Sequence, residues 1–535
     1  MSLLSDLRSR AVAGGLLTAW LVTLLSPGAA GAATSGGWSN LGHGATAGSA
    51  ALNDTVIAMT TVGTDLYVGG YFTNAGGIAA ADRVARWNGN AWSAVGAGLT
   101  NGNVNAIAVD GSKVYVGGSF SNAGGDVNAD NLAVWNGSGW HAVGGVSISS
   151  PVLAMAMVGR TLFIGGGFNN VNGIAEADAV AAYGLDSGIW SAITNDNGDV
   201  GGPVWALAPD GGTGLYVGGL FIDVDGIATA DYVAHWTGGT AWSALGSDGA
   251  GHGAINGIVR GLAVSGSTVY VVGDFTNAGL VGAADRVAKF SSGNWSSLGA
   301  TSFFGDTGQL SIWDIALDGP RVFVVGSFTN AGSHAKVDGV AAFASGAWTN
   351  VGTDAAGTDG PAQRVRAVEV IGARLYIGGL DTSIGGGSLN VCAAYFRLRQ
   401  PDGQIATTGA FLGNNVYNTT GKGQTRSLTV HRNNTGTFKI KVTNDGFATD
   451  TFSVKGPGSS GGFTATYKDG ATTITAAVVA GTYSFSLAPG ASKTINLTVK
   501  VGSGVSVGAS KSWLVTATAT GLGPKDSVKA IVKAS

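Results

Sequence analysis

Short apolar runs separated by turn-forming residues recur along most of this chain. In the clearest copy, residues 56–62 and 66–69 are rich in β-branched and aromatic side chains and flank a Gly-Thr-Asp turn. Residues 84–87 and 91–95 then flank Asn-Gly-Asn, and Asn and Gly accept the positive φ of a tight β-turn. This pattern predicts two β-hairpins, and therefore four strands, in each unit.

The unit recurs seven times, with a Gly at the end of each second run. These marker residues are Gly70, Gly118, Gly166, Gly219, Gly273, Gly326 and Gly379. A repeat of roughly 50 residues with four short strands is typical of a β-propeller. Its strands are almost continuously apolar, as expected for blades that neighbours cover on both faces.

The seventh unit lacks its fourth strand. Residues 365–396 provide three runs, and the missing Trp-containing segment is found near the amino terminus as residues 38–42, which match residues 295–299. Completing the last blade with this segment would remove exposed sheet edges. The sequence therefore predicts an all-β fold, a seven-bladed β-propeller closed by the N-terminal strand.

Three motifs of the unit resemble the kelch repeat. They are a Gly-Gly after the second strand, a Val-Ala-x-aromatic third strand (residues 84–87, 233–236 and 287–290), and a Trp in the fourth strand. The Trp residues are Trp92, Trp140, Trp190, Trp242, Trp295 and Trp348. The resemblance implies a kelch-type propeller, similar to the central domain of galactose oxidase, over about two thirds of the chain, but kelch rings occur in enzymes, adhesins and scaffold proteins alike.

A second domain is predicted after residue 398. Residues 399–423 are interpreted as a linker and entry strand, and residues 424–535 contain about eight short β-runs, which indicates an antiparallel sandwich. The order of turns and strands resembles immunoglobulin-like modules of the CARDB type in secreted bacterial proteins. That resemblance implies a spacer or attachment role.

The first 32 residues predict export. Arg8 and Arg10 precede an apolar stretch that ends at Ala30-Gly31-Ala32, which is typical of a secretory signal peptide. The propeller would then occupy residues 33–398, and no later apolar stretch approaches the ~20 residues of a membrane span. We expect a secreted or cell-surface protein without a transmembrane segment after signal removal.

Composition restricts the partners and the redox chemistry. Charged residues make up 11% of the chain with a formal net charge of -3, so no nucleic-acid partner is predicted. A single cysteine, Cys392, excludes an intramolecular disulfide and is predicted to fill an apolar position in a strand.

One Asp follows each marker Gly at a constant distance in six units. These residues are Asp82, Asp130, Asp178, Asp231, Asp285 and Asp338. One interpretation is a Ca²⁺ site in each blade; the other, which we favour, is a carboxylate that accepts backbone N–H bonds and fixes the loop, because Ca²⁺ requires six to eight oxygen ligands. Asp223 and Asp225 bring two carboxylates together and are the best candidates for a metal site, with Ca²⁺ as the ion; the favoured expectation is that the protein has no cofactor.

The candidate ligand site lies near the start of each first strand. The connections between units lengthen from the third unit onward, so one face of the ring carries the variable loops, where binding sites concentrate. The residues that follow the first Val or Ile are Ile57, Asn105, Leu153, Trp205, Arg260, Trp313 and Arg366. Trp205, Arg260, Trp313 and Arg366 are predicted to offer stacking planes and fixed cations to sugar rings or carboxylates. Alternatively, the Trp side chains pack between blades and the Arg side chains are solvated.

Enzymatic functions have weaker support in the sequence. The resemblance to galactose oxidase suggests a copper-radical oxidase, but none of the six His residues adjoins a Tyr, and the lone Cys lies in the last unit. A glycoside hydrolase needs two carboxyl groups. Candidates are Asp248, Asp306, Asp314, Asp354 and Asp359, in or beside the variable loops, together with Glu176 and Glu369.

No spacing selects a pair among these carboxyl groups, so no catalytic residue is assigned. We therefore predict an exported, non-catalytic binding or adhesion protein that uses its loop-rich propeller face to bind a glycan or an extracellular protein. The alternative is a polysaccharide-active hydrolase or lyase with Asp residues at the mouth of the propeller funnel.

Overall fold

The computed structural model describes residues 38–45, 49–195, 200–239, 241–299, 311–332, 337–344, 346–352, 364–380, 392–414, 416–446, 449–519 and 523–535. The predicted signal peptide lies outside these residues. Within them, no helix combines the length and apolar character needed to cross a membrane.

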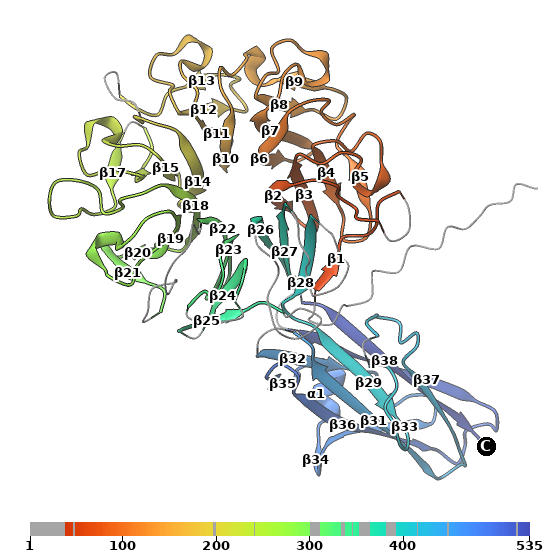
Figure 1. Cartoon of the computed structure of the whole chain (residues 1–535). Coiled ribbons are helices and arrows are strands. Elements are labelled where there is room, and N and C mark those ends of the chain that lie inside the picture. The colour runs from red at the N-terminus through yellow and green to blue at the C-terminus, as the bar shows by residue number, and fades with distance from the viewer. Residues whose placement is uncertain are drawn as a thin grey trace, which may run out of the picture.

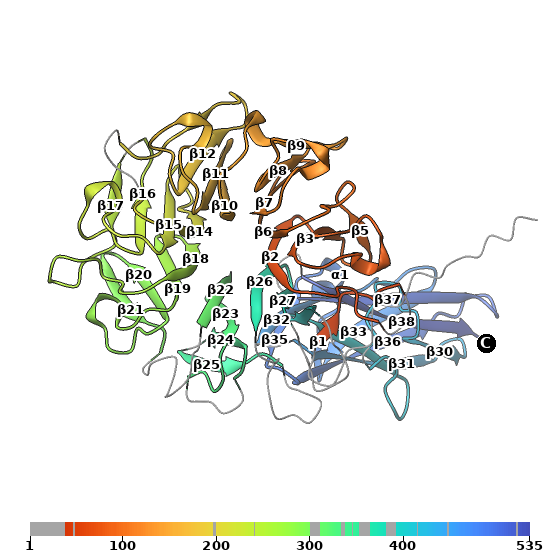
Figure 2. The ribbon, with the colours of Figure 1, turned by 45° about the horizontal axis from the view of Figure 1, so that its top comes forward.

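The fold is all-β, and its first part consists of four-stranded antiparallel sheets arranged side by side around a common centre (Figure 1). Six of the sheets that the described residues form are built from consecutive strands: β2 (Val56–Val62), β3 (Asp65–Gly70), β4 (Val84–Trp87) and β5 (Trp92–Ala94); β6 (Asn103–Asp110), β7 (Lys113–Ser119), β8 (Leu132–Trp135) and β9 (Trp140–Ala142); β10 (Val152–Val158), β11 (Thr161–Gly166), β12 (Val180–Gly184) and β13 (Trp190–Ser191); β14 (Val204–Pro209), β15 (Leu215–Gly219), β16 (Val233–Trp236) and β17 (Trp242–Ala244); β18 (Val259–Ser265), β19 (Thr268–Gly273), β20 (Val287–Ser291) and β21 (Asn294–Ser297); and β22 (Ser311–Asp318), β23 (Arg321–Ser327), β24 (Val340–Ala344) and β25 (Ala347–Asn350). The first strand of each sheet lies nearest the centre (Figure 2). This arrangement is consistent with a β-propeller-like fold.

A seventh four-stranded sheet joins the two ends of this region. It has the order β1 (Trp38–Asn40), β28 (Ala393–Arg397), β27 (Arg374–Gly379) and β26 (Val365–Ile371). Trp38 pairs with Phe396 in antiparallel register. The expected pairing of the N-terminal segment with the last repeat is therefore confirmed.

The paired glycines allow neighbouring sheets to approach closely. A Cβ added to Gly117 would lie 2.5 Å from Val152 Cγ1 on the next sheet, and the same contact joins Gly378 of the last repeat to Val56 of the first at 2.4 Å. A Cβ on the following Gly118 would meet the carbonyl oxygen of Asn103 at 2.0 Å. Only glycine fits both positions, because real Cβ atoms do not come this near to other heavy atoms.

Tryptophans of the outer strands tie most of the sheets to the one before, with the exception of Trp140, whose buried Nε1 has no hydrogen-bond partner within the described residues. The Nε1 of Trp242 donates a hydrogen bond to the carbonyl of Ile193 at 2.9 Å, and Trp348 donates to Leu298 at the same distance. Equivalent bonds join Trp190 to Val143 and Trp295 to Leu245. These bonds satisfy the indole N–H groups of aromatic side chains that are largely buried.

Within the described residues, the loop after the second strand contains a short 3₁₀ turn in five of these sheets. The described turns are η1 (Ala75–Gly77), η2 (Ala123–Gly125), η4 (Val171–Gly173), η5 (Val224–Gly226) and η6 (Ala278–Leu280), and η3 (Val143–Gly145) follows a fourth strand. Asn74 precedes η1 in the left-handed region, at φ 54°, and its N–H donates to Asp82 Oδ1 at 2.7 Å. The same bond recurs at Asp130, Asp178, Asp231, Asp285 and Asp338. The interpretation of this Asp as a loop-fixing acceptor is confirmed, including in the loop that lacks an assigned turn.

The C-terminal part forms two five-stranded sheets around a separate hydrophobic core. One sheet has the order β29 (Pro401–Ala406), β31 (Thr435–Asn444), β36 (Ser492–Val501), β33 (Phe463–Asp469) and β34 (Thr472–Thr473); the other has the order β30 (Thr425–Val430), β38 (Lys525–Ala534), β37 (Ser510–Ala519), β32 (Asp450–Lys455) and β35 (Tyr483–Leu487). The helix α1 (Thr475–Ala480) had no counterpart in the strand pattern. Arg399 joins the two parts, because its guanidinium lies 2.6 Å from Asp318 on β22.

Candidate ligand-binding site

A β-bulge interrupts the first strand of every four-stranded sheet. In the first sheet the register shifts between Val56 and Ala58, which leaves Ile57 as the extra residue. The equivalent residues in the other six sheets are Asn105, Leu153, Trp205, Arg260, Trp313 and Arg366. A bulge redirects the side chain of the extra residue, and all seven of these side chains line one central pocket.

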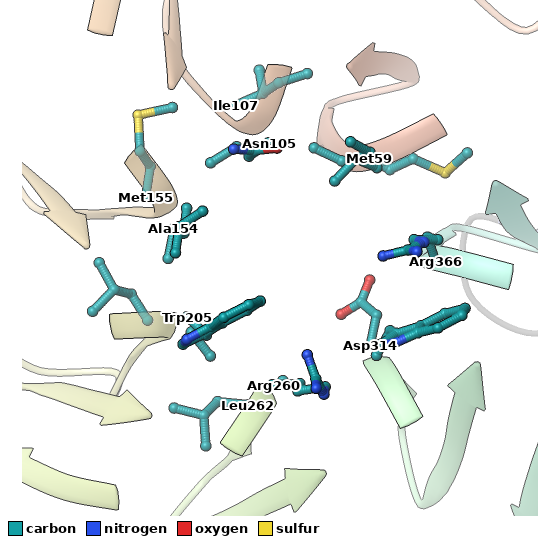
Figure 3. Close-up of a pocket in the computed structure, with 18 of the residues that line it drawn as sticks. Met59, Asn105, Ile107, Ala154, Met155, Trp205, Arg260, Leu262, Asp314 and Arg366 are labelled. Carbon is teal, nitrogen blue, oxygen red and sulfur yellow. The ribbon is translucent and has the colours of Figure 1, made fainter. Parts of the chain in front are cut away.

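The pocket has a volume of about 510 Å³ and unequal sides. Ile57, Asn105 and Leu153 line one side with apolar or neutral groups, whereas the predicted residues Trp205, Arg260, Trp313 and Arg366 line the other. Figure 3 shows Trp205, Arg260 and Arg366 directed into this space from separate strands. The four predicted residues are thus brought together.

Each predicted Arg lies over the ring of a predicted Trp. The guanidinium carbon of Arg260 is 5.2 Å from the ring centroid of Trp205, and that of Arg366 is 4.2 Å from the centroid of Trp313. Trp and Arg therefore alternate over the first strands of four consecutive sheets, β14, β18, β22 and β26. Trp205 is 36% exposed, so its indole retains surface that a ligand can cover.

The two arginines differ in their charge environment. Arg260 is neutralised by Asp274, whose Oδ2 accepts bonds from Nε and Nη2 at 2.8 and 2.6 Å. Arg366 makes no ion pair or hydrogen bond within the residues that the structure describes. Burial, together with the charges of Arg260 and Arg364, lowers the pKa of Arg366 from its usual range. The pocket therefore presents one paired and one unpaired guanidinium group.

Asp314 adds a carboxyl group to the same pocket. Its position in the other six first strands is occupied by Ala58, Ala106, Ala154, Ala206, Gly261 and Ala367. The carboxyl group accepts hydrogen bonds from the backbone N–H groups of Ile315 at 2.8 Å and Val368 at 2.9 Å. Figure 3 shows it directed toward the space between Arg260 and Arg366. Desolvation raises the pKa of Asp314 to about 7.

Asp314 was expected in or beside a variable loop, and the structure places it near the start of a strand. It lies inside β22, one residue beyond the bulge. Repeat alignment offered a signal for its importance, because an acidic residue replaces a small one there. The bulge itself was not visible in the sequence, since its residues differ in chemistry from sheet to sheet.

Glu369 lies close to Asp314 but does not line the pocket. It pairs with Tyr376 on β27, at the position held in the other first strands by Thr60, Ala108, Ala156, Ala208, Ala263 and Ala316. Its Oε1 accepts a hydrogen bond from Thr61 at 3.3 Å. Burial, and next the charge of Asp314, raise the pKa of Glu369 to about 8. Two carboxyl groups on adjacent inner strands are therefore protonated at mildly acidic pH.

At the predicted metal site, the carboxylate of Asp225 is already engaged by another residue. The N–H of Asp223 donates to Asp231, and Asp225 accepts bonds from the backbone and side-chain nitrogens of Asn195 at 3.1 and 2.7 Å. Across the described ranges, no group of three or more His, Cys, Asp or Glu side chains could hold a metal ion. The Ca²⁺ site at Asp223 and Asp225 stays a prediction.

The other acidic candidates lie apart from the central pocket or outside the described residues. Asp248 lines a separate hollow, where its Oδ2 lies 3.0 Å from Nδ1 of the exposed His252. Glu176 follows η4 and does not line the central pocket. Asp306, Asp354 and Asp359 fall in segments that are not described. Cys392 is partly buried and packs against the apolar cluster between the last and first sheets.

Comparison with known proteins does not identify a family. No protein-family model and no curated protein matches the sequence. Solved structures that resemble parts of the chain include the VesB protease of Vibrio cholerae, at 11% identity over 30% of this chain and 44% of that one, with a TM-score of 0.16. Domains 4 and 5 of the S-layer protein SbsC match at 13% identity over 41% and 98% of the two chains, with a TM-score of 0.14, and Escherichia coli alpha-2-macroglobulin matches at 10% over 88% and 25%, with a TM-score of 0.16. The chain spans less than half of VesB, and TM-scores this low carry no argument about function.

Proposed function

We propose that the four-stranded sheets form a closed, seven-bladed, kelch-like β-propeller over residues 33–398. Pairing of Trp38 with Phe396 supports closure by the N-terminal strand, as does the contact of Gly378 with Val56. Residues 399–423 would link this ring to an immunoglobulin-like sandwich over residues 424–535 and would supply its entry strand, β29. The sandwich would act as a spacer or attachment unit.

The proposed function is binding of a glycan in the central pocket by an exported, non-catalytic protein, secreted or held at the cell surface. The supporting observation is the alternation of Trp205, Arg260, Trp313 and Arg366 around one wall. Aromatic faces stack on the C–H groups of sugar rings, and guanidinium groups bond hydroxyl or carboxylate oxygens in a fixed geometry. A rigid, largely preformed cavity with a few polar groups is the usual form of a small-molecule site.

The pocket position also fits the predicted binding face. Its lining includes Tyr71 and Leu380, which directly follow β3 and β27, at the edge from which the loops after the second strands emerge. Tyr71 is 44% exposed. A glycan chain held in the pocket could therefore extend over the loop-rich face, where an adhesion partner on another cell or protein would approach.

Polysaccharide hydrolysis or cleavage is the alternative. Asp314, with its raised pKa, has the property of a general acid, but hydrolysis requires a second carboxyl group across the bond to be broken. Among the described residues that line the pocket, Asp314 is the only acidic one. Incubating the protein with each glycan that it binds, and measuring new reducing ends, distinguishes binding from cleavage.

A glycan array tests the proposal directly. We expect the wild-type protein to bind a defined subset of glycans. Trp313→Ala should lose up to about tenfold in affinity, because a stacked aromatic contact contributes about 0.5–1.5 kcal/mol beyond its buried area. Arg160→Ala is a suitable control, since Arg160 is exposed and pairs with Asp110 and Asp186 outside the pocket. Equal binding by Trp313→Ala and the wild-type protein would contradict a site in the pocket.

A further inference from the structure

We infer that the pocket is selective for acidic sugars of the uronate type, with the carboxylate of the sugar bound by Arg366. This inference rests on the proposed glycan-binding function and specifies its ligand. It follows from the difference between the two arginines and from the placement of Asp314.

The charge of Arg366 is not balanced by a neighbouring carboxylate within the described residues. Asp274 satisfies Arg260 and also lies 3.5 Å from Arg286. Arg366, in contrast, stacks on Trp313 and makes no ion pair or hydrogen bond among the described residues. Arg364, just before β26, adds a further positive charge whose effect reaches Arg366. A guanidinium group in such surroundings favours an anion, and a carboxylate matches its planar pair of N–H donors.

Because Arg366 stacks on Trp313, the site suits an anion that is attached to a sugar ring. With one face of the guanidinium group over the indole at 4.2 Å, the edge that carries its N–H groups is left to bond an anion. Trp205 offers a second aromatic surface two strands away. An oligosaccharide with a uronate residue at Arg366 can therefore place another of its sugar rings against Trp205.

Asp314 complements a carboxylate rather than a second cation. When protonated, its carboxyl group can donate a hydrogen bond to an oxygen of the ligand while its own oxygens accept the backbone bonds from Ile315 and Val368. The charged or titratable groups on the strands packed against it are Arg366 and Glu369 on β26 and Arg260, paired with Asp274, on β18. When Asp314 ionises, it repels a bound carboxylate.

The experiment compares uronate oligosaccharides with their carboxyl-reduced, neutral counterparts of the same length and linkage. Isothermal titration calorimetry at pH 5.5 is expected to give a Kd at least about tenfold lower for the uronate form, and Arg366→Ala is expected to remove most of this preference. Arg366→Lys should restore part of it, because Lys keeps the charge but loses the fork of donors. Arg160→Ala should leave it unchanged.

Asp314→Ala provides a second, independent variant. Alanine is the residue that most of the other first strands carry at this position, so the variant is expected to fold. The wild-type protein should bind the uronate less tightly at pH 8 than at pH 5.5, and Asp314→Ala should reduce this dependence. Arg366→Ala should retain binding of a neutral glycan if one is found.

The outcomes separate the inference from the proposed function. Equal affinity for acidic and neutral counterparts, or an unchanged preference in Arg366→Ala, would overturn the uronate assignment and leave glycan binding intact. A sulfated form of the neutral oligosaccharide that binds as tightly as the uronate would also overturn it. Failure of the wild-type protein to bind any glycan on the array would overturn both.

Discussion

The indole Nε1 of Trp38 donates a hydrogen bond to the backbone carbonyl of Val351 at 3.0 Å, although the two residues are separated by 313 positions in the chain. Trp92 of the first sheet donates in turn to the carbonyl of Leu41 at 2.5 Å. The N-terminal segment therefore connects the last sheet to both of its neighbours. It does so by the same type of indole-to-carbonyl bond that joins other consecutive sheets. It contributes to the fold although it is only three residues long as a strand.

Replacing Trp38 by Ala is expected to destabilise the protein strongly. Its side chain is fully buried against Phe396, and removing a buried Trp costs about 3–5 kcal/mol in the free energy of unfolding. Urea unfolding followed by Trp fluorescence measures the change. Ile189→Ala, at a residue that is 65% exposed, serves as the control and should differ little from the wild-type protein. Wild-type stability in Trp38→Ala would contradict a structural role for the N-terminal strand.

The paired glycines predict a sharp contrast between two Gly→Ala variants. In Gly117→Ala the new methyl group meets Val152 at 2.5 Å, whereas in Gly167→Ala it would lie 3.9 Å from Pro203 Cβ, an ordinary van der Waals contact. Overpacking in a tight contact costs roughly 1–3 kcal/mol, so the melting temperature should fall for Gly117→Ala and stay nearly constant for Gly167→Ala. Equal melting temperatures would mean that the sheets do not need this close approach.

Stability is expected to fall as the pH rises from about 4 to about 8. Asp314 and Glu369 have pKa values raised to about 7 and about 8 in the folded protein, against roughly 4 in an unfolded chain. Between these limits the unfolded chain ionises first and binds fewer protons than the folded one, so the stabilisation present at low pH is lost as the pH rises through the folded pKa values. Thermal melting at pH 5.5 and pH 8 measures the loss.

The double variant Asp314→Ala, Glu369→Ala tests the source of this dependence. We expect it to melt at a higher temperature than the wild-type protein at pH 8, since both positions hold Ala in other sheets, and to show a smaller change between the two pH values. An unaltered pH dependence in the double variant would assign the effect to other groups.

The melting temperature is expected to be the same after treatment with a chelator and after addition of Ca²⁺. The carboxylate of Asp225 is already engaged by Asn195, and a ligand that binds only the folded state would raise the melting temperature. A Ca²⁺-dependent increase that Asp225→Asn abolishes would instead support the metal site predicted at Asp223 and Asp225.

The strands and the positions of the pocket residues could be predicted from the sequence, whereas most of the chemistry of the pocket could not. Marker glycines and outer-strand tryptophans fix the repeat, so aligning the copies locates Trp205, Arg260, Trp313 and Arg366 at one equivalent position. The β-bulge that directs them inward depends on backbone geometry between paired strands, which leaves no constant residue type. The stacking of each Arg on a Trp could not be predicted either, because it depends on how neighbouring sheets are placed.

Asp314 illustrates the remaining difficulty. Expected in or beside a variable loop, it was one of several acidic candidates of equal standing, but among the described candidates it alone lines the central pocket. The protonation of its carboxyl group follows from desolvation by the surrounding sheets, a property of the assembled fold. A residue-by-residue comparison of the repeats would have identified the anomaly but not its consequence.

The most direct test of the proposed function is a crystal structure with the tightest-binding glycan from the array. We expect electron density for at least one sugar ring in the central pocket, in contact with Trp205 or Trp313 and within hydrogen-bond distance of Arg366. A glycan bound on the outer surface of the sheets or on the C-terminal sandwich, with the central pocket empty of sugar, would contradict it.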